Sequence, residues 1–456
     1  MVGSSLASAV HGAVEVAKTN GGRKPNIVIL LADDLGYGET GPQGNKQIPT
    51  PSLDSIAANG VRFTNGYVSC PVCSPTRAGL MTGRYQQRFG HEMNPGPAES
   101  ASTDFGLPLS ETTLAARLKS AGYATGIVGK WHLGYAKGYM PTDRGFDEFF
   151  GFLGGAHPYF VKENTGTNAI RRGSEPIDEK EYLTDAFARE AVSFVNRHKE
   201  KPFFLYLPFN AVHAPLQAPD KYLQRFTSIK DKKRQTFAAM LSAMDDAIGK
   251  VLASIRENDL ENDTLIFFLS DNGGPTPSTT SANGPLRGYK GQVYEGGFRV
   301  PYMVQWKGHI PAGKVYDKPV ISLDIAPTAC ALADAKTENA KFDGVNILPF
   351  LEDTAKRPHD TLYWRFGQQS AIRDGDWKLV KNLEGKTELF DLSTDIGEKT
   401  DLAATKPEKL KELSDRLAKW DSELVKPLWA RKGAKKKKAT APKAQRRKKA
   451  NAKAGV

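Results

Sequence analysis

The sequence predicts an α/β fold: a large, doubly wound, mostly parallel sheet flanked by helices, followed by a smaller C-terminal α+β domain with an antiparallel sheet. Two observations support this prediction. Four short apolar segments alternate with longer amphipathic segments, as in parallel strands connected by helices. After residue 340 the pattern changes to short strands separated by turns.

The four expected strands of the large sheet share an apolar composition and a polar end. They cover 26–32, 125–129, 203–207 and 264–270, and the helices between them cover 114–121, 184–198 and 235–258. The first strand, N-I-V-I-L-L-A, has the continuous apolar run of a strand buried on both faces. Ligands bind at the carboxyl ends of strands in such sheets, so the polar clusters there predict the functional site.

The C-terminal domain is expected over 341–430, after a catalytic domain over 24–340. Its predicted strands cover 361–365, 369–373, 377–380 and 388–392, and Asp374-Gly375 supplies a hairpin turn. Thr405 and Glu408 have the spacing of a capping box and predict the start of a helix that ends near Leu424.

The net charge of +12 comes from the end of the chain. Residues 431–456 hold twelve of the 63 Lys and Arg residues and no acid, so residues 1–430 carry 51 charged residues of each sign. This tail cannot bury a core, and we expect it to be disordered. It either binds anionic surfaces weakly or keeps the protein in solution, and it predicts no specific nucleic-acid partner.

The N-terminal residues 1–23 are expected to be a disordered lead-in or the remnant of a signal. Residues 4–9 resemble the small-residue end of a secretory signal, without a basic or apolar region before them. No apolar run approaches the roughly 18–20 residues of a membrane span. Three cysteines are too few for a disulfide framework.

Cys73 opens the run Cys-Ser-Pro-Thr-Arg, in which a proline stands two residues and Arg77 four residues after the cysteine. Cys70 lacks this spacing, and we expect it to be a buried structural thiol. Cys70 and Cys73 also form a C-x-x-C pair, typical of a redox site or half a zinc site. Zinc would require a second ligand pair, and Cys330 is alone, while a redox pair favours a much smaller chain.

Oxygen donors follow two of the predicted strands. Asp33 and Asp34 end the first strand, and Asp271 and Asn272 end the fourth. Such hard ligands favour Ca²⁺ or Mg²⁺ over zinc. Each pair alone is also typical of a turn or a helix cap, so the metal prediction depends on their combination.

These motifs together resemble the formylglycine-dependent sulfatases, an arylsulfatase-like family of the alkaline phosphatase superfamily. In that family a formylglycine-generating enzyme oxidises the cysteine of C-x-P-x-R to Cα-formylglycine. The hydrated aldehyde attacks the sulfate ester, and its second hydroxyl then expels the sulfate. The resemblance implies formylglycine at Cys73, that maturing enzyme as a partner, and a cation, Ca²⁺ ahead of Mg²⁺, on Asp33, Asp34, Asp271, Asn272 and the modified Cys73.

The resemblance extends from Asp33 to Lys290, over half of the chain. Lys130 and His132 lie in a G-K-W-H-L-G segment, His213 in N-A-V-H-A-P, and Lys290 in L-R-G-Y-K-G. By resemblance, His132 acts on the second hydroxyl, Lys130 and Lys290 hold sulfate, and His213 faces the leaving oxygen. Arg77 would steady the hydrate from a helix that Pro75 can start at its first position.

The implied function is hydrolysis of sulfate esters, with a sulfated carbohydrate as the preferred substrate and a periplasmic or secreted location, although no complete signal peptide is visible. Two alternatives stay open. A phosphate or phosphonate ester hydrolase of the same superfamily would normally use Ser or Thr and two zinc ions. A non-catalytic binder of sulfated glycans would be expected to have lost a metal acid or His132. Residues 154–159, Arg171-Arg172 and 88–91 have the polar and aromatic composition of a sugar subsite.

Overall fold

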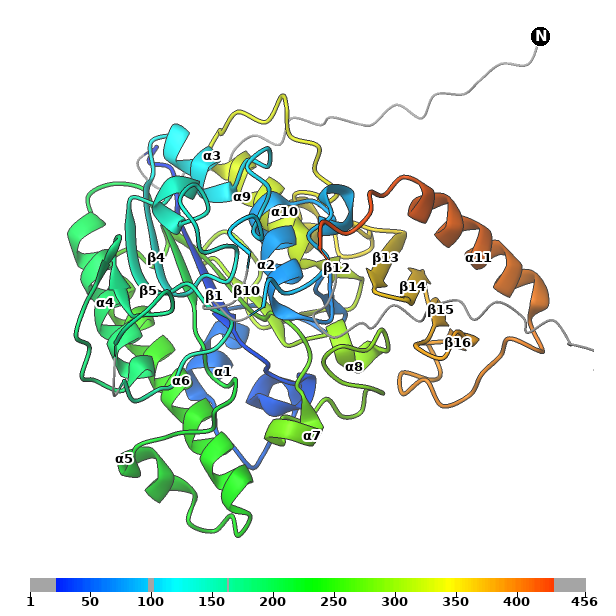
Figure 1. Ribbon diagram of the computed structural model, residues 1–456, viewed down its shortest axis with the longest axis horizontal. Coiled ribbons are helices and arrows are strands. Elements are labelled where there is room, and N and C mark those ends of the chain that lie inside the picture. The colour runs from blue at the N-terminus through cyan, green and yellow to red at the C-terminus, as the bar shows by residue number, and fades with distance from the viewer. Residues whose placement is uncertain (1–21, 97–101, 162–163, 430–456) are drawn as a thin grey trace, which may run out of the picture.

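The computed structural model describes residues 22–96, 102–161 and 164–429. A ten-stranded sheet with helices on both faces forms its larger part, and a separate four-stranded antiparallel sheet lies beside it with one long helix (Figure 1). The predicted fold class is therefore confirmed. The tail over 431–456 and residues 1–21 of the predicted lead-in lie outside the described residues.

The strands of the large sheet are β1 (Asn26–Ala32), β2 (Gly60–Phe63), β4 (Ala124–Lys130), β5 (Glu148–Phe152), β6 (Arg171–Arg172), β7 (Glu175–Pro176), β8 (Phe203–Pro208), β9 (Thr264–Ser270), β10 (Tyr302–Gln305) and β11 (Lys314–Tyr316). Their order is β11-β2-β10-β9-β1-β8-β4-β5-β6-β7. A two-stranded ladder joins β3 (Gly66–Tyr67) to β12 (Val320–Ile321).

The helices are α1 (Pro51–Ala58), α2 (Cys73–Thr82), α3 (Leu114–Ser120), α4 (Leu183–His198), α5 (Asp220–Leu223), α6 (Lys232–Glu257), α7 (Thr276–Thr279), α8 (Glu295–Phe298), α9 (Ile325–Leu332), α10 (Leu348–Glu352) and α11 (Pro407–Ser422). Among the described residues, none of these helices combines the length and the apolar character that crossing a membrane requires.

The four predicted strands are neighbours in the middle of the sheet. They lie in the order β9-β1-β8-β4, and all three pairings are parallel. Side chains of β1 alternate between two cores: Ile27, Ile29 and Leu31 face one, while Val28 and Leu30 face the other. Because the strands are parallel, the polar residues that follow them meet along one edge of the sheet.

Helices cover both faces of this central part. Apolar residues of α1, α4 and α6 complete the core that contains Val28 and Leu30. Residues of α2, α3 and α9 complete the core that contains Ile27 and Ile29. The sheet is therefore buried on both faces, as the continuous apolar composition of its strands requires.

The small sheet consists of β13 (Thr361–Phe366), β14 (Gln369–Asp374), β15 (Trp377–Lys381) and β16 (Thr387–Asp391), each within one or two residues of its predicted range. Its apolar side belongs to the same core as α2. The rings of Trp364 and Phe298 stack with centroids 4.2 Å apart, and Trp364 Nε1 donates to the carbonyl oxygen of Val68 at 2.8 Å. The small sheet is thus packed against the larger part of the molecule.

Two local predictions are wrong. The capping box at Thr405 does not form, because Pro407 occupies the first helical position of α11 and Lys406 becomes the N-cap residue. The Thr405 hydroxyl donates to the Leu402 carbonyl oxygen instead. Pro75 does not start α2, which begins at Cys73; a proline is tolerated there because N–H groups of the first turn have no partner within the helix.

Candidate active site

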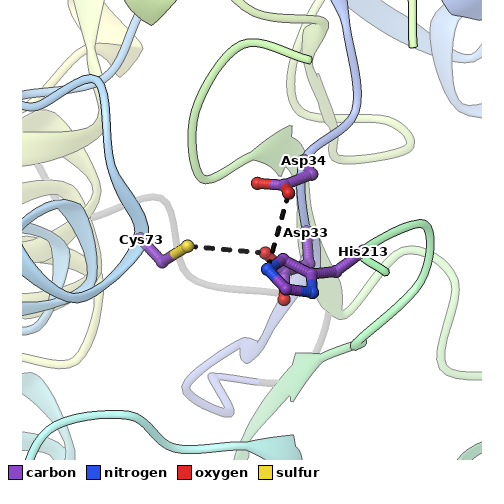
Figure 2. A group of neighbouring side chains, drawn as sticks. All are labelled: Asp33, Asp34, Cys73 and His213. Carbon is purple, nitrogen blue, oxygen red and sulfur yellow. Dashed lines mark hydrogen bonds and ion pairs between the residues drawn. The ribbon is translucent and has the colours of Figure 1, made fainter. Parts of the chain in front are cut away.

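The candidate site lies at the carboxyl edge of the central strands. Asp33 and Asp34 follow β1, Lys130 ends β4, and Asp271 follows β9. Cys73 enters from outside the sheet as the first residue of α2. Figure 2 shows its sulfur directed toward Asp33, with a distance of 3.7 Å between Cys73 Sγ and Asp33 Oδ1.

Four side chains form a group with the donor atoms of a metal site. One ligand atom each from Asp33, Asp34, Cys73 and His213 lies within 4.8 Å of the others (Figure 2). Asp271 is outside this group. Its carboxylate Oδ2 accepts hydrogen bonds from Arg77 Nε at 2.9 Å and Nη2 at 2.7 Å.

Asn272 has an unused acceptor beside this group. Its Nδ2 donates to Asp34 Oδ1 at 2.7 Å, whereas its buried Oδ1 has no hydrogen-bond partner among the described residues. Leaving a buried acceptor unpaired costs about 1–3 kcal/mol. A cation bound to this oxygen and to the Asp33 and Asp34 carboxylates would remove that cost, so the residues present fit a metal ion with a preference for oxygen ligands.

The buried charges of the site balance. Arg77 pairs with Asp271, Lys130 Nζ lies 2.6 Å from Asp33 Oδ2, and Lys290 Nζ lies 2.5 Å from Asp34 Oδ1. The six side chains are buried or nearly so. Burial of a charge is tolerated when an opposite charge and hydrogen bonds compensate it. Three acids from two strand ends thus hold three cations around the Cys73 sulfur.

This environment changes the ionisation of its members. Burial would raise the pKa of the Asp33 carboxyl, but Lys130 and the other nearby cations hold it well below its usual value. Burial raises the pKa of the Cys73 thiol to about 12, despite the opposing charges of Lys130 and Lys290. The unmodified side chain is therefore a neutral thiol at pH 7 in this environment, and a thiol is a poor nucleophile.

His132 is held in an unusual backbone conformation directly after β4. Its φ of +60° is uncommon for a residue other than glycine. The backbone is fixed on both sides: its N–H donates to the Leu153 carbonyl at 3.1 Å, and its carbonyl accepts from the Ser74 hydroxyl at 2.6 Å. Burial, followed by the charge of Lys130, lowers the pKa of His132 well below its ordinary value. Its imidazole is therefore neutral at pH 7 and able to accept a proton.

The two nitrogens of the His213 ring have different partners. Nδ1 lies 2.6 Å from the carbonyl oxygen of Ala214, which can only accept, so Nδ1 carries a hydrogen. Nε2 is then the nitrogen that gains or loses a proton, and it lies 3.6 Å from Asp34 Oδ2. The Tyr159 hydroxyl donates to the His213 carbonyl at 2.9 Å and fixes this loop.

The structure gathers all the predicted site residues at one edge. Of the three segments proposed for sugar binding, residues 154–159 border this site, since Gly155 lies against the His132 ring, whereas arginines of the other two are engaged in ion pairs. Arg88 pairs with Asp343, and Arg172 pairs with Glu190. His91 Nε2 lies 2.7 Å from the Ser74 hydroxyl, which in turn donates to the His132 carbonyl.

Sequence reasoning missed several supporting residues. Nothing in the sequence marks Ser74 as functional, although it directly follows Cys73, and the resemblance places His213 at the leaving oxygen without indicating that it lies beside Asp34. Tyr159 belongs to a segment whose composition indicates sugar binding and not support of a histidine. Each of these residues is distant in the sequence from the group it contacts, and only the tertiary fold brings the two together.

Comparisons with known proteins agree along most of the chain. A family model described as Sulfatase matches residues 25–335, and a second, described as N-sulphoglucosamine sulphohydrolase, C-terminal, matches residues 289–424. Arylsulfatase J of Mus musculus is 32% identical, over 90% of this chain and 78% of that protein. N-acetylgalactosamine-6-sulfatase of Homo sapiens is 36% identical, over 75% of this chain and 68% of that protein.

Solved structures share the fold. The crystal structure of Ps i-CgsB in complex with k-i-k-neocarrahexaose gives a TM-score of 0.85 at 38% identity, covering 89% of this chain and 95% of that chain. The PsFucS1 sulfatase from Pseudoalteromonas sp. gives a TM-score of 0.77 at 26% identity, covering 88% and 91%.

Proposed function

The chain belongs to the sulfatase family and is a sulfuric ester hydrolase, and on that premise we propose that it removes sulfate from a carbohydrate by means of a formylglycine made from Cys73. The observation that carries the proposal is the environment of Cys73. This cysteine has the C-x-P-x-R spacing, is buried, and lies 3.2 Å from the ammonium of Lys290.

The carbohydrate substrate class rests on two similarities. Ps i-CgsB, 38% identical, was crystallised with k-i-k-neocarrahexaose, and a 36% identical human relative is named for N-acetylgalactosamine 6-sulfate hydrolysis. A sulfated sugar has a poor leaving group, so its hydrolysis requires charge stabilisation at sulfate and proton transfer to the leaving oxygen. The candidate site contains groups suited to both tasks.

Formylglycine supplies, in its hydrated form, one hydroxyl for attack on sulfur and a second hydroxyl that allows sulfate to leave. The protein's own groups would prepare this chemistry. The neutral imidazole of His132 accepts a proton from a hydroxyl at position 73. Arg77, held by Asp271, places a positive charge near that position. A formylglycine-generating enzyme is the partner that this proposal requires.

A divalent cation, Ca²⁺ ahead of Mg²⁺, would be held by Asp33, Asp34, Asp271, Asn272 and the modified residue 73. Carboxylate and amide oxygens are the ligands that these hard ions prefer, and the unpaired Asn272 Oδ1 supports the assignment. Such an ion polarises the ester and compensates charge on the sulfate oxygens.

Lys130 and Lys290 bind the sulfate group in this proposal, because both ammonium groups border the Cys73 position. His213 serves the leaving oxygen. Its Nδ1–H is committed to Ala214, so the proton transferred to the alcohol comes from Nε2, and Asp34 stabilises the imidazolium that carries it.

The function is tested by measuring sulfate release from purified, matured protein. Sulfated mono- and oligosaccharides, including neocarra-oligosaccharides, form the test panel, with phosphate and phosphonate esters of the same alcohols as controls. We expect release of sulfate from at least one sugar and far slower release of phosphate or phosphonate. Preferential cleavage of the phosphorus esters would support the alternative hydrolase.

A further inference from the structure

We propose that Lys378 and Glu398, both outside the active site, are positioning residues for the reaction: with Glu295 they fix the segment 287–298 and thereby hold Lys290 against residue 73. The proposal rests on the role given to Lys290 in the proposed function. It assigns a part in catalysis to the small C-terminal sheet, which itself contributes none of the proposed catalytic or metal-binding residues.

The segment 287–298 is attached on one side to the backbone beside the catalytic groups. The Gly291 N–H donates to the carbonyl of Pro71, two residues before Cys73, at 2.8 Å. The Gly273 N–H, next to Asn272, donates to the Gly297 carbonyl at 2.9 Å. A displacement of this segment would therefore shift Lys290 relative to both the nucleophile and the metal ligands.

The other side of the segment is held by the small sheet and the loop after it. Gln369 Nε2 of β14 donates to the Gly291 carbonyl at 2.9 Å, one residue from Lys290. Arg287 Nη1 donates to the Glu398 carbonyl at 2.9 Å, and the Glu295 N–H donates to Glu398 Oε2 at 2.7 Å. The small sheet and the loop after it thus bind the segment at Arg287, Gly291 and Glu295.

Lys378 of β15 is the centre of these contacts. Its side chain has no exposed surface, and its Nζ donates to Glu295 Oε1 at 2.9 Å and to Glu398 Oε1 at 2.7 Å. It also lies 4.6 Å from the ring centroid of Phe298, at the end of the segment. One ammonium therefore joins an acid of the segment to an acid of the C-terminal domain.

Buried ion pairs of this kind are a weak source of stability, because desolvation offsets most of the attraction. They do define geometry, since each ion must keep its partners to remain buried. Glu295 is further bound by the Tyr67 hydroxyl at 2.6 Å and by Arg299 Nη1 at 3.1 Å, so with Lys378 three buried donors hold its carboxylate. The consequence is a rigid support for Lys290, whose own side chain is long and flexible.

A double-mutant cycle with Lys290 tests the proposal. The matured proteins Lys378→Met, Lys290→Ala and the double variant are compared with the wild type on an activated aryl sulfate, which keeps the residual rates measurable. We expect Lys378→Met to lower kcat/KM at least about tenfold, because displacing a catalytic group by about 1 Å can cost 100-fold. In the Lys290→Ala background, Lys378→Met should lower kcat/KM no more than about twofold, because Lys378 affects the rate by positioning the Lys290 side chain, which is absent there.

Arg416→Met is the matched control. Arg416 Nη1 pairs with Asp374 of β14 at 2.8 Å, so the variant disturbs the same small sheet on the side of α11. We expect it to leave kcat/KM unchanged in both backgrounds. Lys378→Arg, which keeps the charge, should recover part of the activity that Lys378→Met loses.

The outcomes separate the two proposals. No loss in Lys290→Ala contradicts the role of Lys290 itself. A large loss in Lys290→Ala together with equal losses for Lys378→Met in both backgrounds overturns the positioning role alone. If Lys378→Met does not fold, Gln369→Met replaces it in the cycle, because this change removes only the side-chain hydrogen bond to the Gly291 carbonyl. Equal losses for Gln369→Met in the two backgrounds would likewise contradict the positioning role.

Discussion

The ammonium of Lys290 lies 3.2 Å from the sulfur of Cys73, although 217 positions separate the two residues in the chain. The same nitrogen lies 2.5 Å from Asp34 Oδ1. A fixed cation stabilises negative charge that develops nearby in a transition state, and burial strengthens this effect. Position 73 is therefore surrounded by charge before any substrate binds.

Removing Arg77 should destabilise the protein. Arg77→Met leaves the Asp271 carboxylate buried without its cation, and loss of one partner of a buried pair costs about 3–5 kcal/mol. The free energy of unfolding in denaturant, measured on the unmodified thiol form, checks this. Lys411→Met removes an exposed pair with Asp415 and should cost about 1 kcal/mol or less. Similar losses for the two variants would contradict the account of Arg77.

Removing the metal should abolish turnover. A chelator is expected to inactivate the matured enzyme, Ca²⁺ to restore it and Zn²⁺ to fail, because the ligand set consists of oxygens. Elemental analysis should find one divalent cation per chain, and Asp33→Ala should lose both the cation and the activity. Two bound zinc ions would favour the phosphatase-type alternative.

The two histidines should differ in their dependence on the leaving group. An activated aryl sulfate needs little protonation as it leaves, so His213→Ala should slow a sugar sulfate far more than an aryl sulfate. His132→Ala should slow both substrates, since it serves the step common to them. Steady-state rates on the two substrates distinguish the cases. Equal losses for His213→Ala would show that its proposed role is wrong.

Glu398 should make stability depend on pH. Burial, partly opposed by Lys378 and reinforced by Glu295, raises the pKa of Glu398 from 4.5 to about 7. The folded state then holds the proton more tightly than the unfolded state, so this contribution to stability is complete below pH 4.5 and is lost as the pH rises through 7.

Glu398→Gln keeps the shape without the titration. The difference in free energy of unfolding, variant minus wild type, should therefore increase between pH 4.5 and pH 7.5. Denaturant titrations at fixed salt measure it. Parallel curves for the two proteins over this range would contradict the raised pKa.

The fold could be predicted where the hydrophobic pattern was long enough. The bounds of β1 and β9 agree with the predicted ranges residue for residue, because each contains an uninterrupted apolar run, 27–32 and 265–269, with polar residues on both sides. The sequence does not predict β2 and β10, since each has only four residues, one of them polar, and so short a segment is equally compatible with a loop or a buried helix. The helix α6 begins three residues before its predicted start, because the Asp231 side chain accepts from the Arg234 N–H and caps it.

The site could be predicted as far as strand ends determine it. The carboxyl ends of parallel strands meet at one edge, so Asp33, Lys130 and Asp271 had to be near one another. Nothing local to the sequence pairs Lys378 with Glu295 and Glu398, because that arrangement depends on how the small sheet packs on the larger part. The bond between Arg77 and Asp271 likewise depends on a helix crossing over the sheet edge.

Formylglycine at position 73 is detected directly by the mass of the peptide that contains this residue, taken from protein produced with a formylglycine-generating enzyme and assayed in parallel for sulfate release. We expect an aldehyde in place of the thiol at Cys73, an unmodified Cys70, and activity that rises in proportion to the modified fraction. Full activity in protein that retains the Cys73 thiol would overturn the formylglycine mechanism.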